Sequence, residues 1–303
     1  MMKRNLMKGS VIPRYSGLPT VLKENGYYNL FFMTHEGQYD NMNAFFRTNG
    51  YDEVFSQEDY PVDKVVNSFG VQDDFLYDYA IPVLNQRAAT GQPFFATLLS
   101  ISNHPPYVIP PFFHPKTSEP EMQIVEYADW ALRQFFEEAR KQPWFDNTIF
   151  VLEGDHGKLV GDAECELPES YNHIPLMIYS SRIQPEEKTA FGGQVDIQPT
   201  ILGLLNIDYL QNNFGVDLLK EERPCMFYTA DNMVVGRNDT LLYLYNYETQ
   251  QELTYDIGNG KLNAVPMDDS FFPLKEYSFS MLQSAEFLVK HGKTLNSIPF
   301  TQQ

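Results

Sequence analysis

Apolar runs alternate with helix-like patterns along the first two-thirds of this 303-residue chain. The runs at 27–34 and 94–101 have the length of buried strands, and segments with a 3.6-residue apolar period stand between such runs. Parallel neighbours in a sheet need a crossover of helical size, so this alternation favours a mainly parallel sheet flanked by helices. The sequence therefore predicts an α/β domain over residues 1–221. Expected helices are 18–25, 41–49, 73–89, 122–141 and 196–205, and expected strands are 27–34, 94–101, 148–152 and 174–179.

The pattern changes after residue 222. Short strand-like runs follow one another without helices between them, and turn-forming residues separate them. This spacing is typical of antiparallel pairing. Residues 222–303 are thus predicted to form a small antiparallel α+β subdomain that packs on the first domain. Its expected strands are 225–230, 241–247 and 252–256, its expected turns are 236–239 and 246–251, and its closing helix is 271–291.

The tetrapeptide Gly154-Asp155-His156-Gly157 follows the apolar run 148–152 directly. Adjacent side chains point opposite ways along a strand, but they can converge where the backbone turns, and the two glycines permit a turn. A carboxylate oxygen and an imidazole nitrogen form a mixed donor set that suits zinc, manganese or a similar divalent ion. We therefore predict that Asp155 and His156 bind a metal; the alternative is an ordinary loop that contains both residues by chance.

Four of the six histidines lie at or near predicted strand ends, which favours a shared pocket. These four are His35, His104, His156 and His173. The other two, His114 and His291, lack this placement and are assigned to structure or surface.

The individual histidines allow different roles. His35 begins a polar loop and either contacts a ligand or belongs to ordinary loop chemistry. His104 precedes two prolines that stiffen its loop, so its imidazole is placed to hold an anionic oxygen or to donate a proton to a leaving group. His173 precedes Ile174-Pro175 and is either a third metal ligand or a group that orients a ligand.

The net charge of −18 argues against nonspecific binding to nucleic acid and suits divalent cations, although a solvated acidic surface explains most of it. Cys165 and Cys225 lie too far apart in sequence for a zinc knuckle, and the sequence leaves a single disulfide open. Because we find neither a run of about 20 apolar residues nor a signal peptide, we expect the given chain to be soluble.

Together these motifs resemble the alkaline-phosphatase-like superfamily, specifically the sulfatase domain of lipoteichoic acid synthase and related phosphoglycerol transferases. The resemblance extends in order over about 180 residues. Its segments are 18–27, His35 with 39–42, 102–107, 154–157, 173–176 and 192–200.

The resemblance implies one divalent ion, Mn²⁺ or Mg²⁺ with Zn²⁺ as a further option, and a threonine nucleophile that attacks a phosphodiester. Asp155 and His156 would bind the metal, with His173 as a further candidate ligand. His35 and His104 would contact the anionic group of the substrate, and His104 would also act in catalysis. Asp196 lies in a matching segment and is interpreted as a helix cap.

The chain departs from the family pattern at its start and in one loop. The family's acidic metal ligand and its nucleophile precede the segment that matches 18–27, and neither has a counterpart here; we nominate neither Thr20 nor Glu24. We therefore expect an N-terminally incomplete domain that is inactive as this chain. The full-length protein is expected to be membrane-anchored, with this domain outside the cytoplasm. Residues 42–44 also differ from the tryptophan and arginine of lipoteichoic acid synthases.

Three functions remain as hypotheses. The first is a transferase of phosphoglycerol or phosphoethanolamine, or a sulfatase-type ester hydrolase, of a bacterial envelope; we favour the transferase. Its substrate would be an anionic ester, either a phosphoglycerol lipid or a sulfate ester. The second is a noncatalytic scaffold that binds an anion or a partner protein, with exposed sheet edges that favour a homodimer. A cytosolic mutase of the same superfamily ranks last, because it needs more metal ligands.

Overall fold

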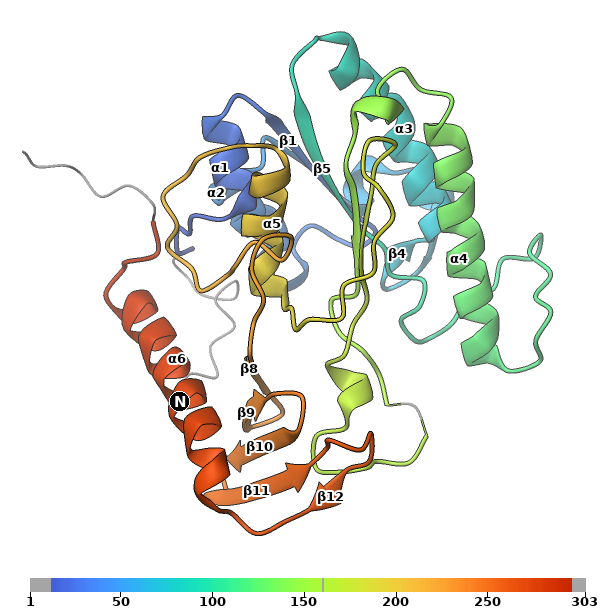
Figure 1. Ribbon diagram of the computed structural model, residues 1–303. Helices are drawn as coiled ribbons and strands as arrows, with labels where there is room; N and C mark the ends of the chain where they lie inside the picture. The colour runs from blue at the N-terminus through green and yellow to red at the C-terminus, as the bar shows by residue number, and fades with distance from the viewer. Residues whose placement is uncertain (1–11, 160, 296–303) are drawn as a thin grey trace, which may run out of the picture. The chain divides into compact units, whose positions relative to one another are not determined.

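The computed structural model describes residues 12–159 and 161–295 (Figure 1). The chain divides into two compact units, and the boundary falls after Thr148. We call the part that ends at Thr148 the first unit and the part that starts at Ile149 the second unit. The domain boundary predicted between residues 221 and 222 lies within the second unit and stays a prediction.

A three-stranded parallel sheet of order β2-β1-β5 lies in the first unit. β1 (Tyr28–Met33) is the central strand, with β2 (Glu53–Phe55) on one edge and β5 (Phe94–Leu99) on the other. The side chains of β1 are almost fully buried because it has a strand on each side and helices packed against it. The predicted parallel sheet with flanking helices is confirmed.

The helices of the first unit agree with the predicted ones within a few residues. α3 packs against α4 and against both β1 and β5. In Figure 1, α3 and α4 lie side by side on the right. The α-helices described in this unit are α1 (Leu18–Glu24), α2 (Met42–Thr48), α3 (Asp73–Ala89) and α4 (Pro120–Ala139).

Three strands of the first unit were absent from the prediction. They are β2 and the hairpin of β3 (Val65–Asn67) and β4 (Gly70–Val71). Each has only two or three residues, too few to show a hydrophobic period.

The second unit begins with β6 (Phe150–Glu153) and β7 (Leu176–Tyr179). The sequence pattern assigns both to the parallel sheet, but among the described residues they pair antiparallel with each other, with Phe150 opposite Tyr179. The described part of the connection, residues 154–159 and 161–175, contains a short 3₁₀ turn and no α-helix. Without a helical crossover, an antiparallel return is the arrangement that the chain can make.

The C-terminal part of the second unit is a five-stranded antiparallel sheet of order β12-β11-β10-β9-β8. It confirms the predicted change to antiparallel structure. α6 (Phe272–Lys290) packs against β8 and β9, and α5 (Ile197–Leu204) precedes the sheet in the chain. The strands are β8 (Met226–Ala230), β9 (Met233–Arg237), β10 (Leu241–Asn246), β11 (Gln251–Asp256) and β12 (Asn263–Ala264).

β9 corrects the prediction of a turn at 236–239, because Gly236 and Arg237 belong to the strand. Residues 233–236 are all buried between neighbouring strands, so they show no polar–apolar alternation that would identify a strand.

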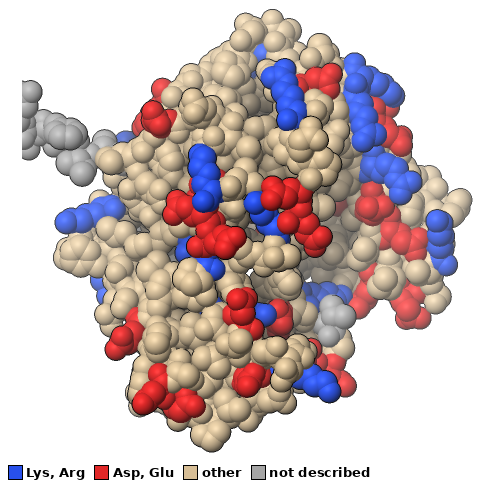
Figure 2. Space-filling view, viewed as in Figure 1, with Lys and Arg blue, Asp and Glu red and all other residues tan. Residues whose placement is uncertain are grey.

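The structure also bears on several properties that were inferred from composition. Cys165 and Cys225 are free thiols, and burial raises the pKa of each. Acidic and basic side chains are interspersed on the face shown in Figure 2, as expected for a solvated acidic surface. Within residues 12–159 and 161–295, no helix combines the length and apolar character needed to cross a membrane.

Candidate functional site

The predicted site residues fall into two groups, one in each unit. His35 and His104 belong to the first unit, whereas Asp155, His156 and His173 belong to the second. Each group is described by itself.

His35 follows the carboxyl end of β1 and is buried, with 3% of its surface exposed. Its carbonyl oxygen accepts from the Gln57 amide (2.9 Å), and the carbonyl of Thr34 accepts from the Val71 amide (3.2 Å). Strand β4 therefore runs directly against the His35 backbone. Gly70 makes this approach possible, because a Cβ there would lie 1.7 Å from the Thr34 oxygen.

His104 lies in the loop after β5 and is exposed. Its amide donates to the carbonyl of Ile101 (2.8 Å), and its ring lies 4.2 Å from the ring of Phe69 in the β3–β4 hairpin. Tyr39 lies 6.5 Å from Phe69 and 4.7 Å from His35, measured between ring centroids. The first unit therefore connects its two predicted site histidines through a series of aromatic rings.

Phe69 and Tyr39 were not nominated from the sequence. A signal for the hairpin exists, because Asn67-Ser68-Phe69-Gly70 is a turn-forming segment that follows two valines. The signal does not tell which loops the hairpin will contact.

The start of the His104 loop is attached to the start of α3 by a buried carboxylate. Asp73 Oδ1 accepts from the amides of Ile101 (2.9 Å) and Ser102 (3.0 Å), and the Asp73 amide donates to Ser102 Oγ (3.0 Å). The sequence suggests only that acidic residues at this helix start favour the helix dipole. Burial raises the pKa of the Asp73 carboxyl above its ordinary value of 3.8, although these hydrogen bonds lower it.

This raised pKa predicts a pH dependence of stability. The folded protein holds the Asp73 proton more tightly than the unfolded chain, so the stability from this group is full below pH 3.8 and is lost as pH rises through the higher folded pKa. Asp73→Asn does not titrate and should gain stability relative to wild type over that interval. Urea unfolding at a series of pH values, followed by fluorescence of Trp130 and Trp144, measures the difference. Two pH profiles that run parallel would contradict the expectation.

Asp155 and His156 lie just beyond the end of β6, and both side chains are largely exposed. The His156 amide donates to Asp155 Oδ1 (2.9 Å), and Asp155 Oδ2 lies 3.8 Å from His156 Nε2. The structure thus brings the two predicted metal donors to the same side of the loop, as predicted from the glycines around them.

The donor atoms of this pair fit a divalent ion. His156 Nδ1 lies 2.7 Å from the carbonyl oxygen of Gly157, which can only accept, so Nδ1 carries the proton and Nε2 presents its lone pair. Metal-binding histidines commonly use this arrangement. A metal ion would lie about 2.0–2.2 Å from each donor atom. Asp155 Oδ2 and His156 Nε2, which are 3.8 Å apart, would therefore need to move only slightly closer to each other.

His173 is not brought into a three-ligand cluster with this pair. Its Nδ1 lies 3.7 Å from Glu169 Oε1, and its amide donates to the carbonyl of Glu169 (2.8 Å). Within residues 12–159 and 161–295, no group of three His, Cys, Asp or Glu side chains is arranged to hold a metal.

His35 and His104 share the tautomer of His156. Nδ1 of His35 lies 3.1 Å from the Glu36 carbonyl oxygen, and Nδ1 of His104 lies 2.7 Å from that of Pro105. In the neutral ring Nε2 is therefore an acceptor. Donation to an anionic oxygen through Nε2 requires the imidazolium form of either residue.

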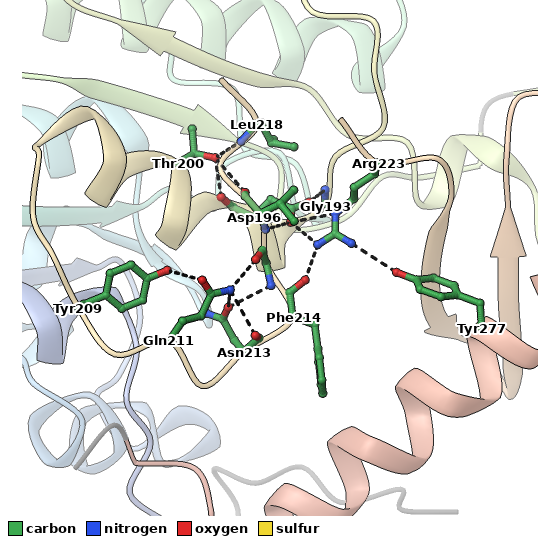
Figure 3. A network of polar contacts seen from close by, with 12 residues as sticks. Gly193, Asp196, Thr200, Tyr209, Gln211, Asn213, Phe214, Leu218, Arg223 and Tyr277 are labelled. Carbon is green, nitrogen blue, oxygen red and sulfur yellow. Dashed lines mark hydrogen bonds and ion pairs between the residues drawn. The ribbon is translucent and has the colours of Figure 1, made fainter. Parts of the chain in front are cut away.

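Asp196 is the N-cap residue of α5, as predicted, but its side chain accepts no hydrogen bond from that helix. It is fully buried and forms an ion pair with Arg223, whose Nε lies 3.0 and 2.9 Å from the two carboxylate oxygens (Figure 3). The amides of Gly193 (2.9 Å) and Val216 (2.8 Å) also donate to it. A buried carboxylate needs such partners, and the distant Arg223 cannot be identified from sequence spacing.

Comparisons with known proteins agree with this fold. The chain is 26% identical to lipoteichoic acid synthase 1 of Bacillus subtilis over 270 residues, which cover 82% of this chain and 40% of the relative. It therefore spans about two-fifths of that relative's length. It is also 26% identical over 230 residues to lipoteichoic acid synthase 2 of the same organism, with 68% of this chain and 35% of the relative covered.

Two crystal structures have the same fold. A protein of the alkaline phosphatase superfamily from Vibrio parahaemolyticus matches with a TM-score of 0.84 and 27% identity, over 96% of this chain and 73% of that one. The lipoteichoic acid synthase LtaP from Listeria monocytogenes matches with a TM-score of 0.76 and 21% identity, over 92% and 73%. The family model described as Sulfatase matches residues 3–207, which is more than half of the chain, and the chain therefore belongs to the sulfatase family.

Proposed function

We propose that this chain provides part of the catalytic domain of a metal-dependent envelope enzyme. That enzyme transfers phosphoglycerol or phosphoethanolamine, or hydrolyses a sulfate ester. The observation that carries the proposal is the Asp155–His156 donor pair at the end of β6, within the region that matches the family model. The names of the relatives, lipoteichoic acid synthases, favour the transferase and a phosphoglycerol lipid as substrate.

The proposed roles follow the chemistry of each side chain. Asp155 and His156 would hold one divalent ion, Mn²⁺ or Mg²⁺ with Zn²⁺ as a further option, and His173 is the further candidate ligand. The bound ion would supply positive charge to the anionic ester. As imidazolium ions, His35 and His104 would donate to the ester oxygens, and His104 would give a proton to the leaving group.

The same proposal concerns where the full-length protein lies and whether this chain alone can turn over substrate. The full-length protein would be membrane-anchored, with this domain outside the cytoplasm. We assign no nucleophile to the chain and expect no turnover from it alone. Metal binding is therefore the property that tests the proposal.

We expect Mn²⁺ to raise the melting temperature of the wild-type chain, because it binds the folded pair and not the unfolded chain. At about ten times Kd the gain is about 1.4 kcal/mol. Asp155→Ala and His156→Ala should each abolish the shift, since each removes one of the two donors. Thermal melts with and without Mn²⁺ measure it.

His114→Ala and Asp129→Ala are the matched controls, because they make the same substitutions at exposed positions that carry no site motif. Both should keep the full Mn²⁺ shift. If all four variants shift equally, Asp155 and His156 do not bind the metal, and the noncatalytic scaffold becomes the better interpretation.

A further inference from the structure

The two proposed metal ligands lie on an exposed part of their loop. The side chains of Asp155 and His156 are 75% and 71% exposed. Their mutual contacts are the hydrogen bond from the His156 amide to Asp155 and the approach of the two donor atoms. Both side chains point largely into solvent, so the geometry of the pair depends on the contacts made by the loop's main chain.

One side of the loop is held by residues 169–171. The amide of Gly157 donates to the carbonyl of Tyr171 (2.9 Å), and the amide of Lys158 donates to that of Ser170 (3.1 Å). A Cβ at Gly157 would lie 1.9 Å from the Ser170 oxygen, so this approach requires glycine. Glu169, at the start of the segment, pairs with Arg237 of β9 at 2.6 Å.

On its other side, the loop's main chain is contacted by the side chain of Gln194. Gln194 Nε2 donates to the carbonyl oxygens of Asp155 (3.0 Å) and Gly154 (3.3 Å). Both acceptors belong to the turn that directs the metal ligands. One amide group therefore spans the two peptide units at which the chain leaves β6.

Gln194 is itself fixed, because it lies in the 3₁₀ turn Gln194–Asp196. That turn is closed by the bond from the Gly193 amide to Asp196 and is anchored by the buried Asp196–Arg223 pair (Figure 3). Arg223 also donates to the carbonyl of Phe214, and its Nη1 lies 3.4 Å from the hydroxyl of Tyr277 in α6. The turn cannot shift without breaking a buried ion pair.

We propose that Gln194 is a positioning residue for the Asp155–His156 metal-ligand loop. It holds one side of the loop while residues 169–171 hold the other. Arg223 and Arg237 anchor the two sides, and both lie beyond residue 207, where the match to the family model ends. Residues beyond 207 thus hold in place the segments that contact the metal-ligand loop. This inference rests on the proposed function, because it concerns the metal that Asp155 and His156 would bind.

The test replaces Gln194 with methionine, which keeps the length of the side chain and removes its donor. The control is Gln134→Met in α4, a half-buried residue whose amide donates to Glu137. The Kd for Mn²⁺ of the full 303-residue chain is measured by electron paramagnetic resonance of the free ion, at a temperature where every variant is folded. We expect Gln194→Met to weaken Mn²⁺ binding about tenfold, as for other groups that orient metal ligands, and Gln134→Met to leave it unchanged.

Melting in EDTA separates positioning from general stability. A positioning role changes the Mn²⁺ affinity and leaves the melting temperature of the metal-free Gln194→Met protein close to that of Gln134→Met. Equal Mn²⁺ affinity in wild type and Gln194→Met would overturn the role of Gln194 while the proposed function stands. Wild-type protein that binds no more Mn²⁺ than Asp155→Ala would overturn the proposed function, and the role of Gln194 with it.

Discussion

Replacing Gly70 with alanine is expected to remove about 3 kcal/mol or more from the free energy of unfolding. The φ angle of Gly70 is +89°, and the new Cβ would lie 1.7 Å from the Thr34 carbonyl oxygen and 2.9 Å from the His35 Cα. Relief requires the β3–β4 hairpin to move away from His35, which breaks the bond from the Val71 amide to Thr34. Urea unfolding followed by the fluorescence of Trp130 and Trp144, both in the first unit, measures the loss.

Gly91→Ala is the matched control for this prediction. Gly91 also has a positive φ of +75°, but a Cβ there would meet nothing within 4 Å. It should therefore show only the backbone cost of about 1–2 kcal/mol. Equal losses at Gly70 and Gly91 would mean that the hairpin moves freely and does not hold His35.

Asp196→Ala should destabilise the second unit by about 3–5 kcal/mol, because it leaves the buried Arg223 guanidinium without its partner. The amides of Gly193 and Val216 also lose their acceptor. Far-UV circular dichroism during urea unfolding is the suitable measurement, since both tryptophans lie in the first unit.

Two further variants isolate the cause of that loss. Asp129→Ala removes an exposed carboxylate whose 3.4 Å pair with Arg133 lies in solvent, and it should change stability by less than about 0.5 kcal/mol. Asp196→Ala combined with Arg223→Met removes the unpaired charge and should regain part of the loss. A double variant less stable than Asp196→Ala would show that the guanidinium contributes mainly through other contacts.

The sequence predicted the elements that have a clear local signal. The helix at 122–141 was predicted from its 3.6-residue apolar period, the helix at 73–89 from acidic residues in its first turn, and the strand at 94–101 from a continuous apolar run. The hairpin of β3 and β4 was missed because it is short, and β9 was missed because its residues 233–236 are all buried and show no polar–apolar alternation. Local pattern thus identifies long helices and long apolar runs such as β1 more readily than short strands.

The candidate site shows the same limit in another form. Asp155 and His156 were nominated because two ligand types stand beside turn-forming glycines, which is a local signal. The partners of the predicted residues are distant in sequence: Phe69 for His104, Ser102 for Asp73, and Arg223 for Asp196. Such partners depend on tertiary contacts, which one sequence does not encode as a pattern. For this reason the sequence predicted the position of Asp196 as a helix cap but not its buried ion pair.

The two kinds of sheet differ in how the chain must assemble them. In the C-terminal sheet each strand pairs with its neighbour in sequence, so it can grow by closing one short hairpin after another. The parallel pair of β1 and β5 joins Tyr28 to Phe94, and the intervening chain must be ordered before that contact forms. Loop-closure entropy makes such nonlocal pairing slow. Strand β9, whose Arg237 pairs with Glu169 beside the Asp155–His156 loop, is thus expected to form early in folding, whereas the parallel sheet that positions His35 and His104 is expected to form late.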